Sequence, residues 1–142
     1  MKAMGCDTAG CLMYGIIVTP DDFVGDAYGR LSTAFGIDYD CDADDLDSND
    51  LVEIMELLEK KLRRYRMDCE VFSSYVDPAW VVGKRVAYVD GDGAGYAATS
   101  EAKISAAVRF AKKRRDVFRR LRAAMPTVGI AQLVVTVMRT DS

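Results

Sequence analysis

Short runs of apolar residues alternate along the chain with longer segments in which apolar positions recur every three or four residues. The apolar runs predict β-strands and the longer segments predict α-helices, because side chains repeat every two residues along a strand and about every 3.6 along a helix. The predicted strands are residues 12–18, 70–76, 81–89 and 130–138, and the predicted helices begin near Pro20, Leu51 and Glu101.

The ends of these helices carry their own sequence signals. Thr19 suits a hydroxyl cap, Pro20 suits the first helical turn, and Gly36 suits a left-handed stop. The last helix is expected to run without a break from about Glu101 to Met125, where a proline follows. With the first two helices counted as one crossover, the element order is β-α-β-β-α-β.

This order resembles the ferredoxin-like superfold, and the resemblance covers nearly the whole chain. It implies a single α+β domain over residues 1–142, with a four-stranded antiparallel sheet in the spatial order 4-1-3-2 and helices on one face. The resemblance is one of topology and carries no family motif, and the superfold hosts many unrelated functions. It therefore implies a fold and no activity.

The first and last predicted strands are apolar on both alternating sides, so the side of the sheet away from the helices also needs a cover. A monomer rarely leaves a large contiguous apolar patch in water. We expect a homo-oligomer, with a dimer as the first choice, that associates through this face; burial of a ligand or of another partner is the alternative. The candidate residues for the oligomer face are Tyr14, Trp80, Tyr88, Leu133 and Val135.

Charge is divided unequally along the chain. Residues 1–60 hold 14 acids and 3 bases, a net of −11, whereas residues 61–142 hold 8 acids and 16 bases, a net of +8. The bases gather on one side of the last helix, where they would neutralise phosphates of an anionic partner; a solvated helix that complements the acidic half is the alternative. The candidate anion-binding residues are Arg109, Lys112, Lys113, Arg119 and Arg120.

Arg114 differs from these bases because it projects into the apolar arc of the same helix. A buried carboxylate or an oligomer contact would give its guanidinium a partner. Otherwise we expect its aliphatic stem to lie along the helix edge and its charge to reach solvent.

Aspartates crowd the connector between the first two helices. Their alternate spacing resembles the first half of an EF-hand calcium loop, in which carboxylates converge on one cation. The match ends there, because Ala43 replaces the turn glycine and Asn49 replaces the closing glutamate. We expect no cofactor and a solvated acidic loop, with weak binding of a divalent cation as the alternative. The candidate metal ligands are Asp38, Asp40, Asp42 and Asp44.

Two further segments are candidates for contacts with phosphates or bases. A glycine-rich loop follows the third strand and would let backbone N–H groups approach a phosphate, but it matches neither a dinucleotide fingerprint nor a P-loop. A plain connecting loop is the alternative. Residues 84–89 are faintly similar to an RNA-recognition segment but lack most of its aromatic residues. The candidate phosphate-loop residues are Gly91, Gly93 and Gly95.

Catalysis has little support in the residue types. The chain has no histidine, which is the usual general base near neutral pH, and its four cysteines form no Cys-x-x-Cys pair for zinc or redox chemistry. No apolar run reaches the roughly 20 residues of a membrane span. We therefore expect a cytoplasmic protein with reduced thiols and no membrane partner.

The sequence favours a non-enzymatic, homo-oligomeric binding or regulatory protein that contacts an anionic partner through its basic helix. That partner would be a nucleic acid, a nucleotide-like ligand or an acidic protein surface. One alternative is a metal-dependent enzyme of phosphate chemistry that uses the aspartate-rich connector. Another is a small viral or accessory inhibitor that acts by binding a protein.

Overall fold

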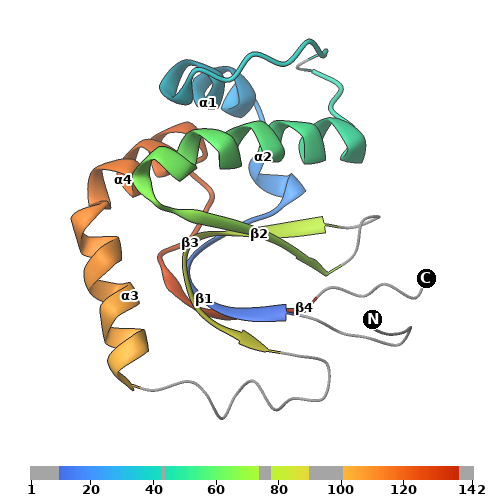
Figure 1. Cartoon of the computed structure of the whole chain (residues 1–142). Helices are drawn as coiled ribbons and strands as arrows, with labels where there is room; N and C mark the ends of the chain where they lie inside the picture. The colour runs from blue at the N-terminus through green and yellow to red at the C-terminus, as the bar shows by residue number, and fades with distance from the viewer. Residues whose placement is uncertain (1–9, 43, 74–77, 90–100, 138–142) are drawn as a thin grey trace.

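In the part of the chain that the structure describes, four antiparallel strands form one sheet (Figure 1). This computed structural model describes residues 10–42, 44–73, 78–89 and 101–137. The strands are β1 (Gly10–Val18), β2 (Asp68–Ser73), β3 (Pro78–Val89) and β4 (Gln132–Val137). Their order is β2-β3-β1-β4, which is the predicted 4-1-3-2 order read from the other edge, so the predicted α+β architecture is confirmed.

The helices lie on one side of this sheet. They are α1 (Ala27–Phe35), α2 (Ser48–Leu62), α3 (Glu101–Lys113) and α4 (Arg115–Ala124), with short 3-10 turns at Pro20–Asp22 and Arg63–Tyr65. Helix α2 packs on β2, α3 packs on β3 and β1, and α4 packs against α1 (Figure 1). None of the helices in the described ranges is both long and apolar enough to cross a bilayer.

The chain after β1 forms less helix than predicted. Only Pro20–Asp22 is helical at the predicted start, and the next helix begins at Ala27. Gly25 lies between them with φ 59°, a left-handed conformation that interrupts the helical path. The predicted left-handed stop at Gly36 is confirmed, with φ 68°.

The prediction of one long helix from Glu101 to Met125 is wrong at Arg114. This residue has φ −110° and ψ 21°, which separates α3 from α4. The two helices have different partners, because α3 lies on the sheet whereas α4 lies on α1 (Figure 1). The change of direction at Arg114 lets one amphipathic segment cover both partners.

The main core lies between the helices and one face of the sheet. Alternate residues of the central strands point into it, namely Ile16, Val18, Trp80 and Val82. Most of the buried apolar residues of the described chain belong to this layer, and burying one large side chain of this kind stabilises the fold by about 1.5–3 kcal/mol. The helices contribute Leu31, Ile54, Met55, Leu58, Leu62, Phe118 and Leu121.

The other face of the sheet is closed within the same chain. The sheet rolls until its two edge strands, β2 and β4, approach each other. A second cluster fills the roll: Cys11, Met13 and Val81 are 2%, 0% and 0% exposed, and Phe72 and Val134 pack against them. The expectation that a second molecule must cover these positions is wrong, because the curvature of the sheet already covers them.

The residues predicted for an oligomer face are dispersed over the fold. Tyr14 packs against the main core, and Trp80 is 3% exposed within it, so both are core residues. Leu133 pairs with Tyr14 across β1 and β4, which places Leu133 and its alternate neighbour Val135 on the helix-bearing face, where they are 45% and 37% exposed. The side chain of Tyr88 lies outside the described residues. A homo-oligomer stays a prediction.

Two glycines let β1 and β3 come close where the sheet bends. Gly15 pairs with Gly83. A Cβ atom on Gly15 would overlap the Val82 carbonyl group, and one on Gly83 would overlap the Tyr14 carbonyl group. A register shift just before Gly15 adds to the bend, as β-bulges do. Side chains at these two positions would push the strands apart and open the roll.

We expect Gly83→Ala to lower the free energy of unfolding by about 1–3 kcal/mol, because the new methyl group has rigid backbone to displace. Urea denaturation measures the loss. Gly129→Ala is the matched control, since nothing lies within 4 Å of a Cβ atom at Gly129. Equal stability of the two variants would contradict the proposed close approach.

Candidate anion-binding surface

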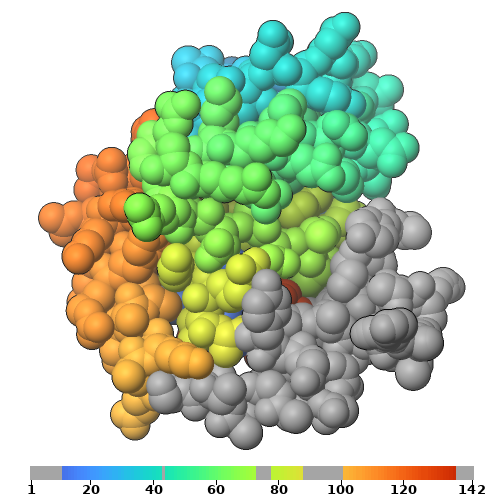
Figure 2. Space-filling view, in the orientation of Figure 1, coloured from blue at the N-terminus to red at the C-terminus, as the bar shows by residue number. Residues whose placement is uncertain are grey.

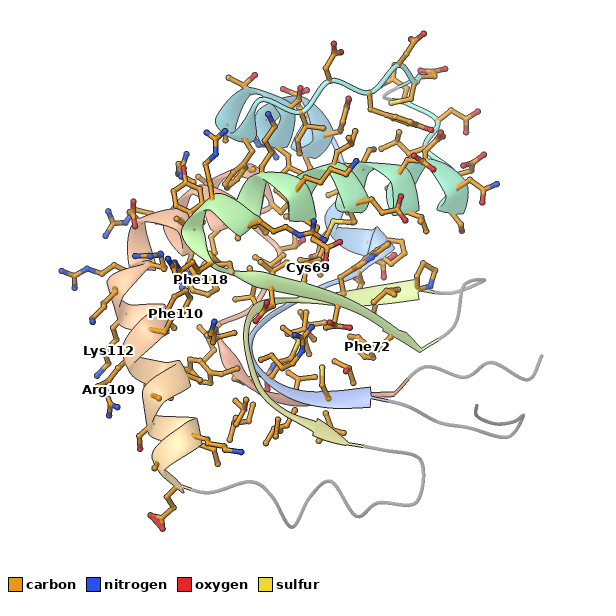
Figure 3. The ribbon with its side chains drawn as sticks, in the orientation of Figure 1. Cys69, Phe72, Arg109, Phe110, Lys112 and Phe118 are labelled. Carbon is orange, nitrogen blue, oxygen red and sulfur yellow. The ribbon has the colours of Figure 1, made fainter. Side chains whose placement is uncertain are left out.

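Positive charge from three separate chain segments gathers on one side of the molecule. Figure 3 shows nitrogen-bearing side chains along α3, with Arg109 and Lys112 directed away from the sheet. The turn after α2 and strand β3 supply the other cations. We define the basic surface as Arg63, Arg64, Arg66, Lys84, Arg109, Lys112, Lys113 and Arg114.

Contacts around Phe110 hold these segments together. The Lys84 Nζ atom lies 4.8 Å from the centre of the Phe110 ring and donates a hydrogen bond to the Arg66 carbonyl oxygen over 3.4 Å. The Arg114 Cζ atom lies 5.1 Å from the same ring, and its Nε donates to the Tyr65 carbonyl oxygen over 2.8 Å. Each cation–ring contact contributes about 0.5–1 kcal/mol at an exposed site. Two of the cations therefore tie the turn after α2 to β3 and to the end of α3.

The guanidinium groups of Arg114 and Arg120 contact other parts of the same chain. The partners of Arg114 are a carbonyl group and a ring, whereas the sequence suggested a carboxylate, an oligomer contact or solvent. Arg120 donates to the Tyr65 hydroxyl over 2.9 Å and to the Ala34 carbonyl oxygen over 3.3 Å. Its Cζ atom also lies 4.8 Å from the centre of the Phe35 ring. Arg120 thus joins α4, α1 and the turn after α2, although it was predicted to bind an anion.

The other four predicted anion-binding residues point into solvent. They are exposed, and among the described residues none of them has a carboxylate partner. Within the described part of the chain, no acidic side chain therefore neutralises their charges. These residues are Arg109, Lys112, Lys113 and Arg119.

Neighbouring arginines on α4 should respond differently to truncation. We expect Arg120→Ala to lower the free energy of unfolding by about 1–2 kcal/mol, because it removes two hydrogen bonds and two ring contacts. Arg119→Ala should stay within about 0.5 kcal/mol of the wild type, as exposed substitutions usually do. Chemical denaturation of both variants tests this, and equal losses would contradict the structural role of Arg120.

Sequence reasoning assigned only three of the eight residues of the basic surface to anion binding, namely Arg109, Lys112 and Lys113. Arg63, Arg64 and Arg66 lie within four residues at the end of a predicted helix, and this cluster was the available signal. Their proximity to α3 depends on contacts such as Arg114 to Tyr65, which join residues distant along the chain. The spacing of residues along the sequence gives no information about such a long-range contact.

The acidic connector leads to the opposite end of α2. The aspartates from Asp42 to Asp50 lie before this helix or in its first turn, whereas Arg63 follows its last residue. Helix α2 has 15 residues and is about 22 Å long, which exceeds the screening length of about 8 Å at physiological salt. Figure 3 shows oxygen-bearing side chains at one end and nitrogen-bearing side chains at the other. The two charged regions therefore do not neutralise each other within the monomer.

Asp50 ties the acidic connector to α2. The Asp50 amide donates to Asp47 Oδ1 over 2.8 Å, and the Asp47 amide donates back to Asp50 Oδ2 over 3.1 Å, which forms a capping box. The Tyr39 hydroxyl donates to Asp50 Oδ1 over 2.9 Å. The Asp47 amide first, and then the Tyr39 hydroxyl, lower the pKa of Asp50. The same contact with Asp50 raises the pKa of Tyr39 to about 12.

Acid should weaken this cap. The pKa of Asp50 is lower in the folded chain than in the unfolded chain, so its contribution to stability is present above the ordinary pKa near 4 and is lost as the pH falls through the folded pKa. We expect Asp50→Asn to lower the Tm at pH 7, and the difference from wild type to shrink toward pH 2. Asp45→Asn, at an exposed position in the same connector, is the control. A difference that is constant with pH would contradict this role.

The other candidate site residues do not join the basic surface. The aspartates predicted as metal ligands, from Asp38 to Asp44, are all exposed. Within the described ranges, no three acidic, cysteine or histidine side chains lie close enough together to hold a metal ion. The glycine-rich loop, with Gly91, Gly93 and Gly95, lies outside the described residues. The clefts beside Trp80, Leu46 and Pro78 contain none of the cations of the basic surface in their linings.

The chain matches no known protein-family model, no curated protein and no solved structure. Its likeness to the ferredoxin-like superfold therefore rests on the order of its elements and strands. Any function has to be argued from the chemistry of the surface itself.

Proposed function

We propose that the protein is a non-enzymatic binding protein that holds the phosphate backbone of a nucleic acid on its basic surface. The main support is the meeting of cations from the turn after α2, from β3 and from α3 on one side of the fold. Arg109, Lys112 and Lys113 of α3, which are exposed and have no carboxylate partner among the described residues, release phosphate counterions when a polyanion binds, and this release drives association at low salt.

The shape of the basic surface favours a polymer over a small ligand. The cations that α3 adds to the basic surface lie in its last five residues, Arg109 to Lys113, and the arginines of the turn after α2 lie beside this end of the helix. A duplex carries one charge per about 1.7 Å of its axis, so several cations engage it at once. A single nucleotide is usually held in a concave pocket, and the three clefts beside Trp80, Leu46 and Pro78 contain none of these cations among their described residues.

The geometry gives less support to a metal-dependent enzyme of phosphate chemistry. Such an enzyme needs its metal ligands and its phosphate-binding cations in one place. Here the aspartates of the connector precede α2, and the basic surface begins beyond its other end.

The proposed compartment is the cytoplasm. Cys11, Cys41 and Cys69 are free thiols, a state that a reducing compartment maintains. Two of the three are buried, which protects their sulfur atoms from reagents in solvent.

Charge reversal on α3 tests the proposal. The triple variant Arg109→Glu, Lys112→Glu and Lys113→Glu should bind a short DNA duplex about 10- to 100-fold more weakly at low salt. The slope of log affinity against log salt should fall by about 0.9 for each lost phosphate contact. Fluorescence anisotropy across a series of salt concentrations measures both quantities.

A charge-conserving triple variant is the matched control. Arg109→Lys, Lys112→Arg and Lys113→Arg should retain the affinity within a few-fold, because each position keeps its charge. Polyglutamate of equal total charge serves as a competitor, and displacement of the duplex at equal charge concentration would favour an acidic protein surface as the partner. Equal binding by the wild type and the charge-reversed protein would contradict the proposal that the basic surface binds the phosphate backbone.

A further inference from the structure

A cleft of about 250 Å³ lies between α2 and β2. Figure 2 shows the surface where the green helix α2 meets the yellow-green strand β2, and Figure 3 shows Cys69 between this helix and the sheet. Part of the lining is deeply buried, with Met55, Cys69 and Trp80 at 1%, 9% and 3% exposed. The volume is below the roughly 300–1,000 Å³ of sites for drug-sized ligands, so it suits a short chain of a few heavy atoms.

The charged groups of the lining are all acidic. Glu56 and Glu59 come from α2 and Glu70 comes from β2, and the described residues of the lining include neither lysine nor arginine. Glu59 lies 3.6 Å from Arg63, and Glu70 forms an ion pair with Arg85. Glu56 is exposed, and among the described residues it has no cationic partner. One carboxylate of the cleft is therefore available to a cation from outside.

The buried thiol of Cys69 lies close to carboxylates of the cleft. Its pKa is raised first by burial, and then by the negative charges of Glu59, Glu70 and Asp68. These three carboxylates all act on the thiol in the same direction, as a negative field does. A positive group that enters the cleft is attracted by the same field.

We propose that this cleft binds an alkylammonium or alkylguanidinium group, with the charge beside Glu56 and the aliphatic stem against Met55 and Trp80. The apolar lining removes the stem from water, and the carboxylate supplies a charge-assisted hydrogen bond. A carboxylate ligand would be repelled by the three glutamates, and a neutral alcohol would gain only the apolar contact.

This site is independent of the proposed nucleic-acid function. The cleft takes a cation, whereas the basic surface takes an anion, and the two share no residue. Loss of one activity therefore leaves the other measurable in the same protein. The ligand group is either a free organic cation or the side chain of a lysine or arginine in a partner protein, and the experiment separates the two sources.

Trp80 provides the readout because it is the one tryptophan in the sequence. We titrate the full chain with butylguanidinium chloride at constant ionic strength and follow the tryptophan fluorescence. A saturable change is expected, whereas butanol and butyrate should give none. Glu56→Gln should weaken binding about fivefold or more, because it removes the charge from a charge-assisted hydrogen bond. Circular dichroism confirms that the variant is folded.

Glu53→Gln is the matched control. Glu53 is exposed on the same helix and is outside the lining, so its variant should bind like the wild type. The affinity of a blocked arginine peptide separates the two sources of the ligand group. If the peptide binds more tightly than butylguanidinium, the site binds the side chain of a partner protein. If the two affinities are equal, the site binds a free cation. A response that does not saturate, an equal response to butanol, or unchanged binding by Glu56→Gln overturns the proposal.

Discussion

The roll of the sheet is the constraint on which the rest of the structure depends. Strand β1 is apolar on both sides, and a flat sheet would have exposed one of them. The close approach of β1 and β3 at Gly15 and Gly83 lets the sheet curl, so Met13 and Val81 are buried inside the curl. The convex side is the one left for the helices. Both apolar sides are thus covered by a single chain.

The curved surface then determines the path of the helices. Helix α3 follows the sheet, and the chain turns at Arg114 so that α4 meets α1 (Figure 1). Polar contacts stabilise this turn from outside the core, because Arg114 and Arg120 both hydrogen-bond to Tyr65. Arginine suits this task, since its planar group binds oxygen atoms and lies on rings at the same time. Some cations in the basic half of the chain therefore hold the fold together, whereas others are exposed to solvent. The charge of a residue alone does not show to which of these two groups it belongs.

Sequence reasoning reached the strands, their order and the exposed cations of α3, because each leaves a local pattern. It missed the break at Arg114, since apolar positions continue at helical spacing from Phe110 to Phe118. It also assigned the second apolar side of β1 to a partner molecule, because a rolled sheet and a sheet in an oligomer share the same alternation. The cleft beside Trp80 was invisible for a further reason. Its lining comes from α2, β2 and β3, and only tertiary packing brings those side chains together.

The separation of charge along α2 has a mechanical consequence. Acids gather before the helix and in its first turn, and bases gather after its last turn, which also matches the polarity of the helix dipole. The molecule therefore carries a large electric dipole moment although its net charge is only −3. A strongly charged surface exerts a torque on such a body before any contact forms. Near a polyanion such a torque favours orientations in which the arginine-rich end leads, so collisions would already be oriented before contact.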